Sequence, residues 1–365
     1  MKKNIPWATP SFWGNEKKYV ADALDSGWIS SGEYVDQLEE RFADYCQIPY
    51  AVSASNATTA THMSYLALNI GSGDEVIVPG FGFICAANIA LHVGAKPVFA
   101  EVNEESWCVT AANIEKLITK KTKAIAVIHT YGNVCDMDAI MALAESNNLA
   151  VIEDAAQSLG SKYKGKFSGT IGTVGIFSFQ ATKTITTGEG GAVITSDEKL
   201  RDRMKLFRSH GMTVKKYWHE VAGHNFRLTN MQAALGCAQL EKIDQITVER
   251  SRVYDSYKAN LSKIDGIKMQ KYSDNVEPLV WAVGLTLDSS AYPQGRDQLI
   301  IQLKEKGIET RPGFYSANTM PHLYGDLKLP ICQSLSDSVI SLPSSPILKN
   351  EEIHYICEAL KSLRI

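Results

Sequence analysis

The segment at residues 177–191, FSFQATKTITTGEGG, contains the clearest candidate for chemistry in this chain. An apolar run ends at Ser178, Lys183 follows among threonines, and a glycine-rich turn comes next. A dense, uncharged neighbourhood is a costly place for a lysine unless its amine has a chemical task, and Schiff-base formation with an aldehyde is such a task. Taken alone, however, a lysine beside a glycine turn is most often a solvated surface residue.

A carboxylate follows an earlier apolar run. Residues 149–160, LAVIEDAAQSLG, pass from continuous apolar residues directly to Glu153 and Asp154. Open α/β sheets bind ligands at the carboxyl ends of their parallel strands, so Asp154 is a candidate partner for a pyridinium nitrogen. A carboxylate in that place keeps the ring protonated and makes it a stronger electron sink. The alternative is that Asp154 only caps the following helix.

A third segment is suited to an anion. Residues 53–63, SASNATTATHM, join a predicted strand to a predicted helix through small polar residues. Backbone N–H groups at such a helix start, together with the Thr58 hydroxyl, form a site of the kind that binds phosphate. Asn, Ser and Thr at a helix start are otherwise ordinary caps, so this segment is informative only in combination with the other two.

The elements that must position these residues follow from the hydrophobic pattern. Residues 50–195 alternate short β-branched runs with helical patterns, which predicts a mainly parallel sheet flanked by helices. We expect strands at residues 51–54, 75–78, 97–101, 124–129, 150–153, 175–178 and 191–195. We expect helices at residues 58–69, 83–93, 111–117, 137–146 and 350–363, and one helical stretch at 230–262.

The length indicates two domains. Single hydrophobic cores stop growing at roughly 250–300 residues, and this chain has 365. The predicted fold class is therefore α/β, with a large α/β domain at residues 1–245 and a smaller C-terminal α+β domain at residues 246–365.

Composition excludes several classes of partner. Lys and Arg total 37 against 40 Asp and Glu, so the net charge of −3 favours neither nucleic acid nor an anionic membrane. The most apolar window, residues 76–95, is interrupted by proline and glycine and is not expected to span a bilayer. The N-terminal segment lacks the apolar core of a secretory signal, and the seven scattered cysteines favour reduced thiols over a zinc site. We expect a cytoplasmic protein without a metal site.

The ordered combination of segments resembles the DegT/DnrJ/EryC1/StrS sugar aminotransferase family, and within it the perosamine-forming branch. Besides residues 177–191, the resemblance is carried by GWISSG (27–32), SNATTA (55–60), GDEVIVP (73–79), IEDAAQ (152–157), GHNFRLTNMQAALGCAQLEKID (223–244) and ETRPGFY (309–315). It implies the aspartate aminotransferase-like fold, type I of the enzymes that depend on pyridoxal 5'-phosphate (PLP). It also implies a homodimer whose two active sites are shared between the subunits.

The resemblance assigns residues to the cofactor ring. Lys183 would bind the PLP aldehyde and, once released, shuttle a proton as the catalytic base and acid. Asp154 would pair with the ring nitrogen, Gln157 would contact the ring hydroxyl, and Phe83 would stack on the ring. A lone phenylalanine after a strand is by default a core residue.

The resemblance also assigns the phosphate contacts. The Ala57 N–H group, Thr58 and Ser178 would hold the phosphate, and Asn225 would complete its site from the neighbouring subunit. The chain departs from the family pattern at Ala57, where glycine is usual, and at His224, where an aromatic residue is usual.

The implied reaction has two substrates. Glutamate would donate an amino group and a nucleotide-linked keto-sugar would accept it, for surface polysaccharide synthesis. A GDP-linked 4-keto-6-deoxyhexose is the expected acceptor, with a 3-keto sugar as the alternative. The candidate substrate contacts are Asn88, His129, Arg311 and Asn318, the last at a position where the family commonly has histidine.

Two other classes stay open. One is a PLP-binding regulatory protein without turnover, although the predicted domains leave no segment for DNA binding. The other is an α/β protein that binds a nucleotide sugar without PLP. Some relatives with histidine in place of the lysine are dehydratases, and Lys183 argues against that branch.

Overall fold

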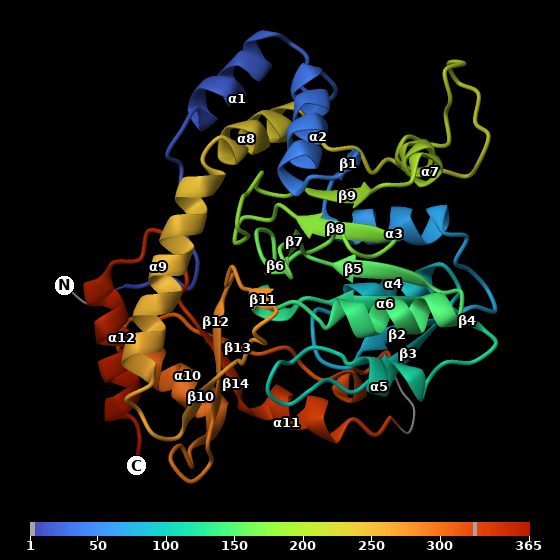
Figure 1. Ribbon diagram of the computed structural model, residues 1–365. Coiled ribbons are helices and arrows are strands. Elements are labelled where there is room, and N and C mark those ends of the chain that lie inside the picture. The colour runs from blue at the N-terminus through green and yellow to red at the C-terminus, as the bar shows by residue number, and fades with distance from the viewer. Residues whose placement is uncertain (1–3, 324–326) are drawn as a thin grey trace.

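The larger sheet has seven strands. The computed structural model describes residues 4–323 and 327–365, and within them the sheet has the order β1-β9-β8-β5-β4-β2-β3 (Figure 1). The strands are β1 (Tyr50–Ala54), β2 (Glu75–Pro79), β3 (Lys96–Ala100), β4 (Thr122–Ile128), β5 (Ala150–Asp154), β8 (Val174–Ser178) and β9 (Gly191–Thr195). Strand β9 runs antiparallel to both neighbours, whereas the pairs from β8 to β3 are parallel.

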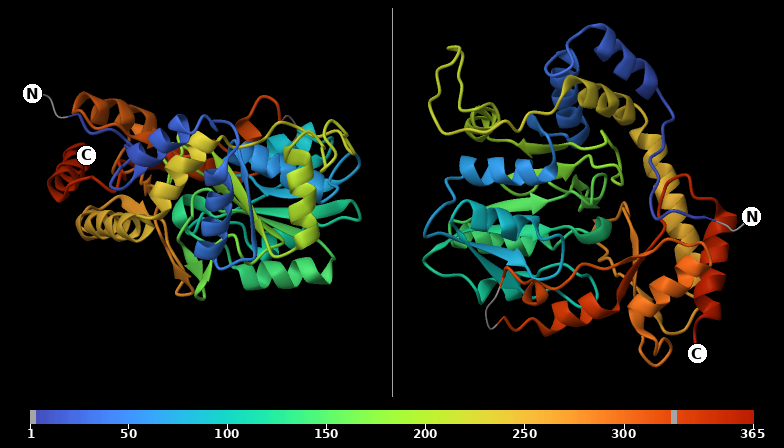
Figure 2. Two further views of the ribbon diagram at one scale, coloured as in Figure 1. Left: turned by 90° about the horizontal axis from the view of Figure 1, so that it is seen from above. Right: turned by 180° about the vertical axis from the view of Figure 1, so that it is seen from behind.

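Helices cover both faces of this sheet. Helix α6 lies on one face, and α3 and α4 lie on the other (Figure 2). The helices of this region are α3 (Ala57–Ala67), α4 (Cys85–His92), α5 (Ala111–Glu115), α6 (Met137–Ser146) and α7 (Glu198–Arg208), with a 3₁₀ turn at Thr130–Gly132. Cover on both faces explains why strands such as β2 and β8 are buried at every position. The seven predicted strands and the helices predicted between them are confirmed, each end within two residues.

The helical stretch predicted at residues 230–262 is confirmed in extent, but it is divided into two helices. Two helices occupy it, α8 (Asn230–Leu240) and α9 (Ile243–Leu261). Helix α8 packs on α1 (Glu16–Asp25) and α2 (Glu33–Cys46), whereas α9 packs on α12 (Asn350–Ser362). Helix α8 and the first residues of α9, Ile243 and Ile246, are buried in one core, whereas the rest of α9 is buried in the core of the second sheet. A periodic pattern read along the sequence does not reveal such a division.

The C-terminal part is built around a second sheet. It is antiparallel throughout, in the order β10-β12-β14-β13. Its strands are β10 (Ile267–Met269), β12 (Val283–Leu287), β13 (Arg311–Pro312) and β14 (Val339–Leu342), and its further helices are α10 (Gly295–Glu305), α11 (Pro330–Ser338) and a 3₁₀ turn at Ala317–Thr319. A small third sheet joins β11 (Val276–Glu277) to β6 (Lys162–Tyr163) and β7 (Lys166–Phe167).

We propose that the chain divides near residue 245, at the start of α9. The second sheet has its own hydrophobic core, to which α9, α10 and α12 contribute. The N-terminal segment joins this core as well, since Ile5 N donates to Gly307 O (2.8 Å) and Glu309 N donates to Ile5 O (2.9 Å). Residues 5–7 of the first part are thus packed on the second.

Within the described residues, no helix has the length and apolar character needed to cross a bilayer.

A buried carboxylate stabilises the loop between β7 and β8. Glu153, in β5, is fully buried, and its oxygens accept hydrogen bonds from the backbone N–H groups of Gly169 (2.8 Å), Ile171 (2.7 Å) and Gly172. The imidazole of His129 also contacts Glu153, with Nε2 2.8 Å from Oε2. These contacts satisfy a charge that would otherwise be expensive to bury.

Replacing this carboxylate should destabilise the fold. Glu153→Gln introduces an amide NH₂ group that faces backbone donors, so we expect the free energy of unfolding to fall by about 3 kcal/mol. Urea denaturation followed by circular dichroism measures this. The matched control is Glu145→Gln on the exposed face of α6, expected to change stability by less than about 0.5 kcal/mol. Equal effects of the two substitutions would contradict the assigned role of Glu153.

Candidate active site

A cavity of about 410 Å³ lies between the two sheets. Asp154 and Ser178 reach it from the carboxyl ends of β5 and β8, Trp281 from the segment before β12, and Arg311 from β13. Its volume falls within the range of roughly 300–1,000 Å³ that is common for small-molecule sites. Eight of the candidate residues line it: Ala57, Thr58, Phe83, Asp154, Gln157, Ser178, Lys183 and Arg311.

Lys183 carries its amine into this cavity. Its backbone N donates to Gln180 O (2.8 Å), and its Nζ lies 3.6 Å from the centroid of the Trp281 ring. Burial lowers the pKa of the Lys183 amine to about 8; Asp154 opposes this shift and Arg250 adds to it. The lowered pKa leaves about a tenth of the amine neutral at pH 7, far more than for an ordinary lysine, and the neutral form is the one that acts as a nucleophile or general base.

Asp154 and Gln157 present polar groups to the same space. Asp154 Oδ1 accepts from Ala156 N (3.0 Å), and burial raises the pKa of this carboxyl despite the lowering effects of the Ala156 N–H group and Lys183. A cation placed opposite Asp154 would stabilise its charged form. Gln157 Oε1 accepts from Tyr131 N (3.0 Å), which leaves the amide NH₂ as the donor available to the cavity.

The start of α3 forms an anion site at one end of the cavity. Asn56 caps the helix, its Oδ1 accepting from Thr59 N (2.9 Å). This cap uses the third N–H group of the helix, so the N–H groups of Ala57 and Thr58 remain for a ligand. The motif glycine Gly191 permits this geometry, because a Cβ there would lie only 2.7 Å from Ala57 N.

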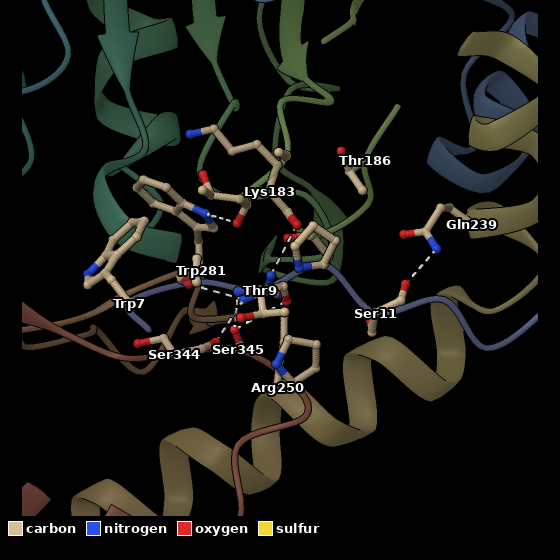
Figure 3. A pocket seen from close by; sticks show the side chains of 16 residues that line it. Trp7, Thr9, Ser11, Lys183, Thr186, Gln239, Arg250, Trp281, Ser344 and Ser345 are labelled. Carbon is tan, nitrogen blue, oxygen red and sulfur yellow. Dashed lines mark hydrogen bonds between the residues drawn. The ribbon is translucent and has the colours of Figure 1, made fainter. Parts of the chain in front are cut away.

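Aromatic side chains that the sequence did not single out form one wall. Trp7, Tyr131, Trp281 and Phe314 line the cavity beside Phe83. The rings of Tyr131 and Trp281 stack with centroids 5.9 Å apart, and Trp7 meets Trp281 edge to face at 5.5 Å. Figure 3 shows Trp7 and Trp281 side by side near Lys183. Tyr131 follows the carboxyl end of β4, so the strand-end rule could have found it, whereas Trp7 and Trp281 belong to no local motif.

The expectation that His129 contacts a substrate was wrong. The side chain is fully buried and does not line the cavity. Both ring nitrogens are engaged: Nε2 contacts Glu153 Oε2 (2.8 Å), and Nδ1 accepts from Cys135 N (3.3 Å). His129 follows β4 and faces the structural carboxylate of β5, so its role is to support the sheet.

Asn88 and Asn318 also lie outside the cavity lining. Asn88 Oδ1 contacts His322 Nε2 (2.8 Å). Asn318 Nδ2 donates to Gln333 Oε1 (3.1 Å), so the amide is held on the surface by α11. Within this chain the structure does not bring these two asparagines together with Lys183.

Asn225 is exposed and likewise outside the cavity of its own chain. The segment that carries it is firmly held: the His224 ring stacks on Phe226 with centroids 4.5 Å apart, and Phe226 O accepts from Ser55 N (2.8 Å). Histidine thus serves as a stacking residue at the position where the family usually has an aromatic one.

Comparison with known proteins agrees with this geometry. A family model described as the DegT/DnrJ/EryC1/StrS aminotransferase family matches residues 11–361. GDP-perosamine synthase of Escherichia coli O157:H7 is 45% identical over 362 residues, and that of Vibrio cholerae is 39% identical over 365, each alignment covering 98% of both chains. The PLP form of a putative sugar aminotransferase, Spr1654 from Streptococcus pneumoniae, superposes with a TM-score of 0.94 at 27% identity, covering 99% of this chain and 98% of that one.

The predicted fold is therefore confirmed. The similarities extend over nearly the whole length of the chain and include both sheets as well as the lysine segment. The family model spans all of the elements that line the cavity except the segment with Trp7. This chain belongs to the DegT/DnrJ/EryC1/StrS aminotransferase family.

Proposed function

We propose that the protein is a PLP-dependent aminotransferase that moves an amino group from glutamate to a nucleotide-linked 4-keto-6-deoxyhexose, most simply a GDP-linked one, for surface polysaccharide synthesis. The observation that carries this proposal is the amine of Lys183, which shares a cavity with the carboxylate of Asp154 and the open start of α3. Identity of 39–45% to GDP-perosamine synthases supports the choice of sugar.

The residues of the cavity fit PLP. Lys183 would hold its aldehyde, Asp154 its ring nitrogen and Gln157 its ring hydroxyl, while Phe83, 55% exposed and bordering the cavity, would cover a ring face. The phosphate would lie at the start of α3, on the Ala57 N–H group, Thr58 and Ser178. When bound, PLP supplies the electron sink for the carbon that carries the amino group.

The chain supplies the proton transfers. Lys183 Nζ, with its lowered pKa, would take the proton from the amino-bearing carbon of the donor and, in the second half of the reaction, would deliver a proton to the former carbonyl carbon of the acceptor. Asp154 favours the protonated ring because its own buried charge requires a cation. The aromatic wall of Trp7, Tyr131 and Trp281 limits access of water to the reacting atoms.

Arg311 is the proposed anchor for the diphosphate of the acceptor. Its guanidinium lies 4.2 Å from the centroid of the Trp7 ring, at the border of the cavity. A guanidinium stacked on an indole keeps its N–H groups free in the plane to bind phosphate oxygens. Glu309, 3.7 Å away, is an exposed counterion that a diphosphate would displace.

A homodimer with shared sites completes the proposal. Asn225 is exposed, fixed in place and absent from the lining of its own cavity, as expected of a residue that acts in the site of a second subunit. We also propose that the enzyme works in the cytoplasm, because all seven cysteines are free and buried.

Lys183 should be the residue that carries the cofactor. Among the lysines in residues 4–323 and 327–365, only Lys183 lines the cavity that contains Asp154, so borohydride reduction followed by peptide mapping should find reduced PLP on Lys183. Lys183→Ala should yield no reduced adduct and no turnover. Reduced cofactor on Lys162, Lys164 or Lys166 would contradict the assignment. A protein that shows no PLP absorption at all would instead favour a nucleotide-sugar binder without PLP.

Subunit mixing tests the shared site. Asn225→Ala and Lys183→Ala chains, denatured and refolded together, should recover activity beyond the sum of the two parents, because one site of each heterodimer contains both native residues. Random pairing in a twofold dimer limits the recovery to about a quarter of the native sites. Refolded wild-type protein controls for losses during mixing. Recovery no greater than the parental sum would place both residues in one chain.

The acceptor should be a 4-keto sugar. With glutamate as donor, turnover is expected to be fastest on GDP-linked 4-keto-6-deoxyhexose, slower on dTDP- or UDP-linked forms, and weakest on 3-keto isomers. NMR of the product assigns the aminated carbon. If only the 3-keto compounds were aminated, amination at carbon 4 would be contradicted, whereas the assignment as an aminotransferase would still hold. If PLP binds but neither the 4-keto nor the 3-keto sugars are aminated, a regulatory role would be favoured.

A further inference from the structure

Arg250 of α9 is a buried cation whose partners are carbonyl groups. It is 4% exposed, and its Nη1 donates to Trp281 O (3.0 Å) and Ser344 O (3.3 Å), while Nη2 donates to Lys183 O (3.1 Å). In residues 4–323 and 327–365, no acidic side chain forms an ion pair with it. Burial lowers the pKa of this guanidinium to about 10. A buried charge without a counterion is expensive, so packing alone does not account for an arginine here.

The three carbonyls belong to segments that meet behind the reacting lysine. Figure 3 shows Arg250 below Lys183. Trp281 also holds the loop that carries Lys183. Its Nε1 donates to the carbonyl oxygen of Thr182, the residue before Lys183 (2.7 Å). Two successive carbonyls of the lysine loop are therefore held by residues of the C-terminal half of the chain. The backbone of Lys183 has little freedom to shift.

The side chain of Lys183, in contrast, has four flexible carbons. Its Nζ rests 3.6 Å from the centroid of the Trp281 ring, where a cation is stabilised by the ring face. The acidic group that attracts it across the cavity is Asp154. The Trp281 ring thus binds the amine of Lys183 whenever the amine is not bound to the cofactor. Both positions must be reached from one fixed backbone.

We propose that Arg250 is a positioning residue for the reaction: its guanidinium joins the Lys183 peptide to Trp281 and Ser344, so that the amine moves between the reacting atoms and the Trp281 ring from a fixed origin. This proposal rests on the proposed role of Lys183. Arg250 touches neither substrate nor cofactor in it. The positive charge of Arg250 has a second effect on Lys183. It lowers the pKa of the amine and so favours the neutral form that reacts.

Two substitutions separate these effects, Arg250→Gln and Arg250→Lys. The first readout uses the full-length protein freed of cofactor: acetylation of Lys183 by acetic anhydride, followed by mass spectrometry across pH. In the wild type the rate of Lys183 acetylation should rise with pH and reach half of its maximum near pH 8, because burial lowers the pKa of the amine to about 8. Arg250→Gln should move this midpoint upward, towards an ordinary lysine, since a like charge is removed. Arg250→Lys retains the charge and should leave the midpoint in place.

The second readout is steady-state kinetics with saturating PLP. Both variants lose the bridge between the three segments, so kcat should fall about 100-fold while KM for either substrate changes less than about threefold. The matched control is Arg252→Gln, two residues along α9. Arg252 also donates to backbone carbonyls, those of Pro346 (3.3 Å) and Leu348 (2.7 Å), but does not contact the lysine loop. The control should change neither the midpoint nor kcat.

A purely structural role predicts different results. If Arg250→Gln lowers the melting temperature while the Lys183 midpoint and kcat stay at the wild-type values, the proposal is overturned. Should Arg250→Gln not fold, Arg250→Lys decides: wild-type kcat overturns the proposal, and a 100-fold loss with full cofactor occupancy supports it. Failure of the underlying function is recognised separately, because borohydride mapping would then place the cofactor on another lysine.

Discussion

The structure depends on the electrostatic interaction between Lys183 and Asp154. Burial destabilises the charged form of each of these two side chains. Burial lowers the pKa of the amine and raises that of the carboxyl, and the charge of each group opposes the shift of the other. The pair exists only because β5 and β8 are neighbours and parallel, so that both end at the same edge of the sheet. Burial of β5 between helical layers is in turn what deprives Asp154 of water.

The second half of the chain keeps this pair out of solvent. Its contribution is a wall of Trp281, Phe314 and Arg311, with the N-terminal Trp7 packed between. The N-terminal segment reaches this place by joining residues 307–309, far from it in the sequence. Helix α9 begins in the core that it shares with α8 and continues into the core of the second sheet. The cavity is therefore a product of how two cores meet, and Arg250 lies where they do.

Two histidines show how position in the fold decides chemistry. His129 follows β4 at the edge where ligands bind, yet it faces Glu153 and is fully buried. His224 stacks on Phe226 and also contacts the tilted ring of His62, in the segment that presents Asn225. Both side chains contain groups suited to catalysis, but the surrounding contacts give each of them a structural role. The amine of Lys183 lies on the face of the Trp281 ring and forms no hydrogen bond with the described residues, so it retains its freedom to react.

Local patterns determined much of this protein. Strand and helix positions follow from side-chain periodicity, and Ser178, Lys183 and Asp154 could be found because each lies in a short motif at a strand end. The same holds for Ala57 and Thr58 at the start of α3. The aromatic wall, the Arg250 contacts and the burial of His129 were decided by tertiary structure alone. Trp7 and Trp281 are 274 residues apart, and their contact depends on the packing of two cores, which no local pattern encodes. Sequence periodicity reports which face of an element is buried, whereas the partner that buries it is chosen only when the elements assemble.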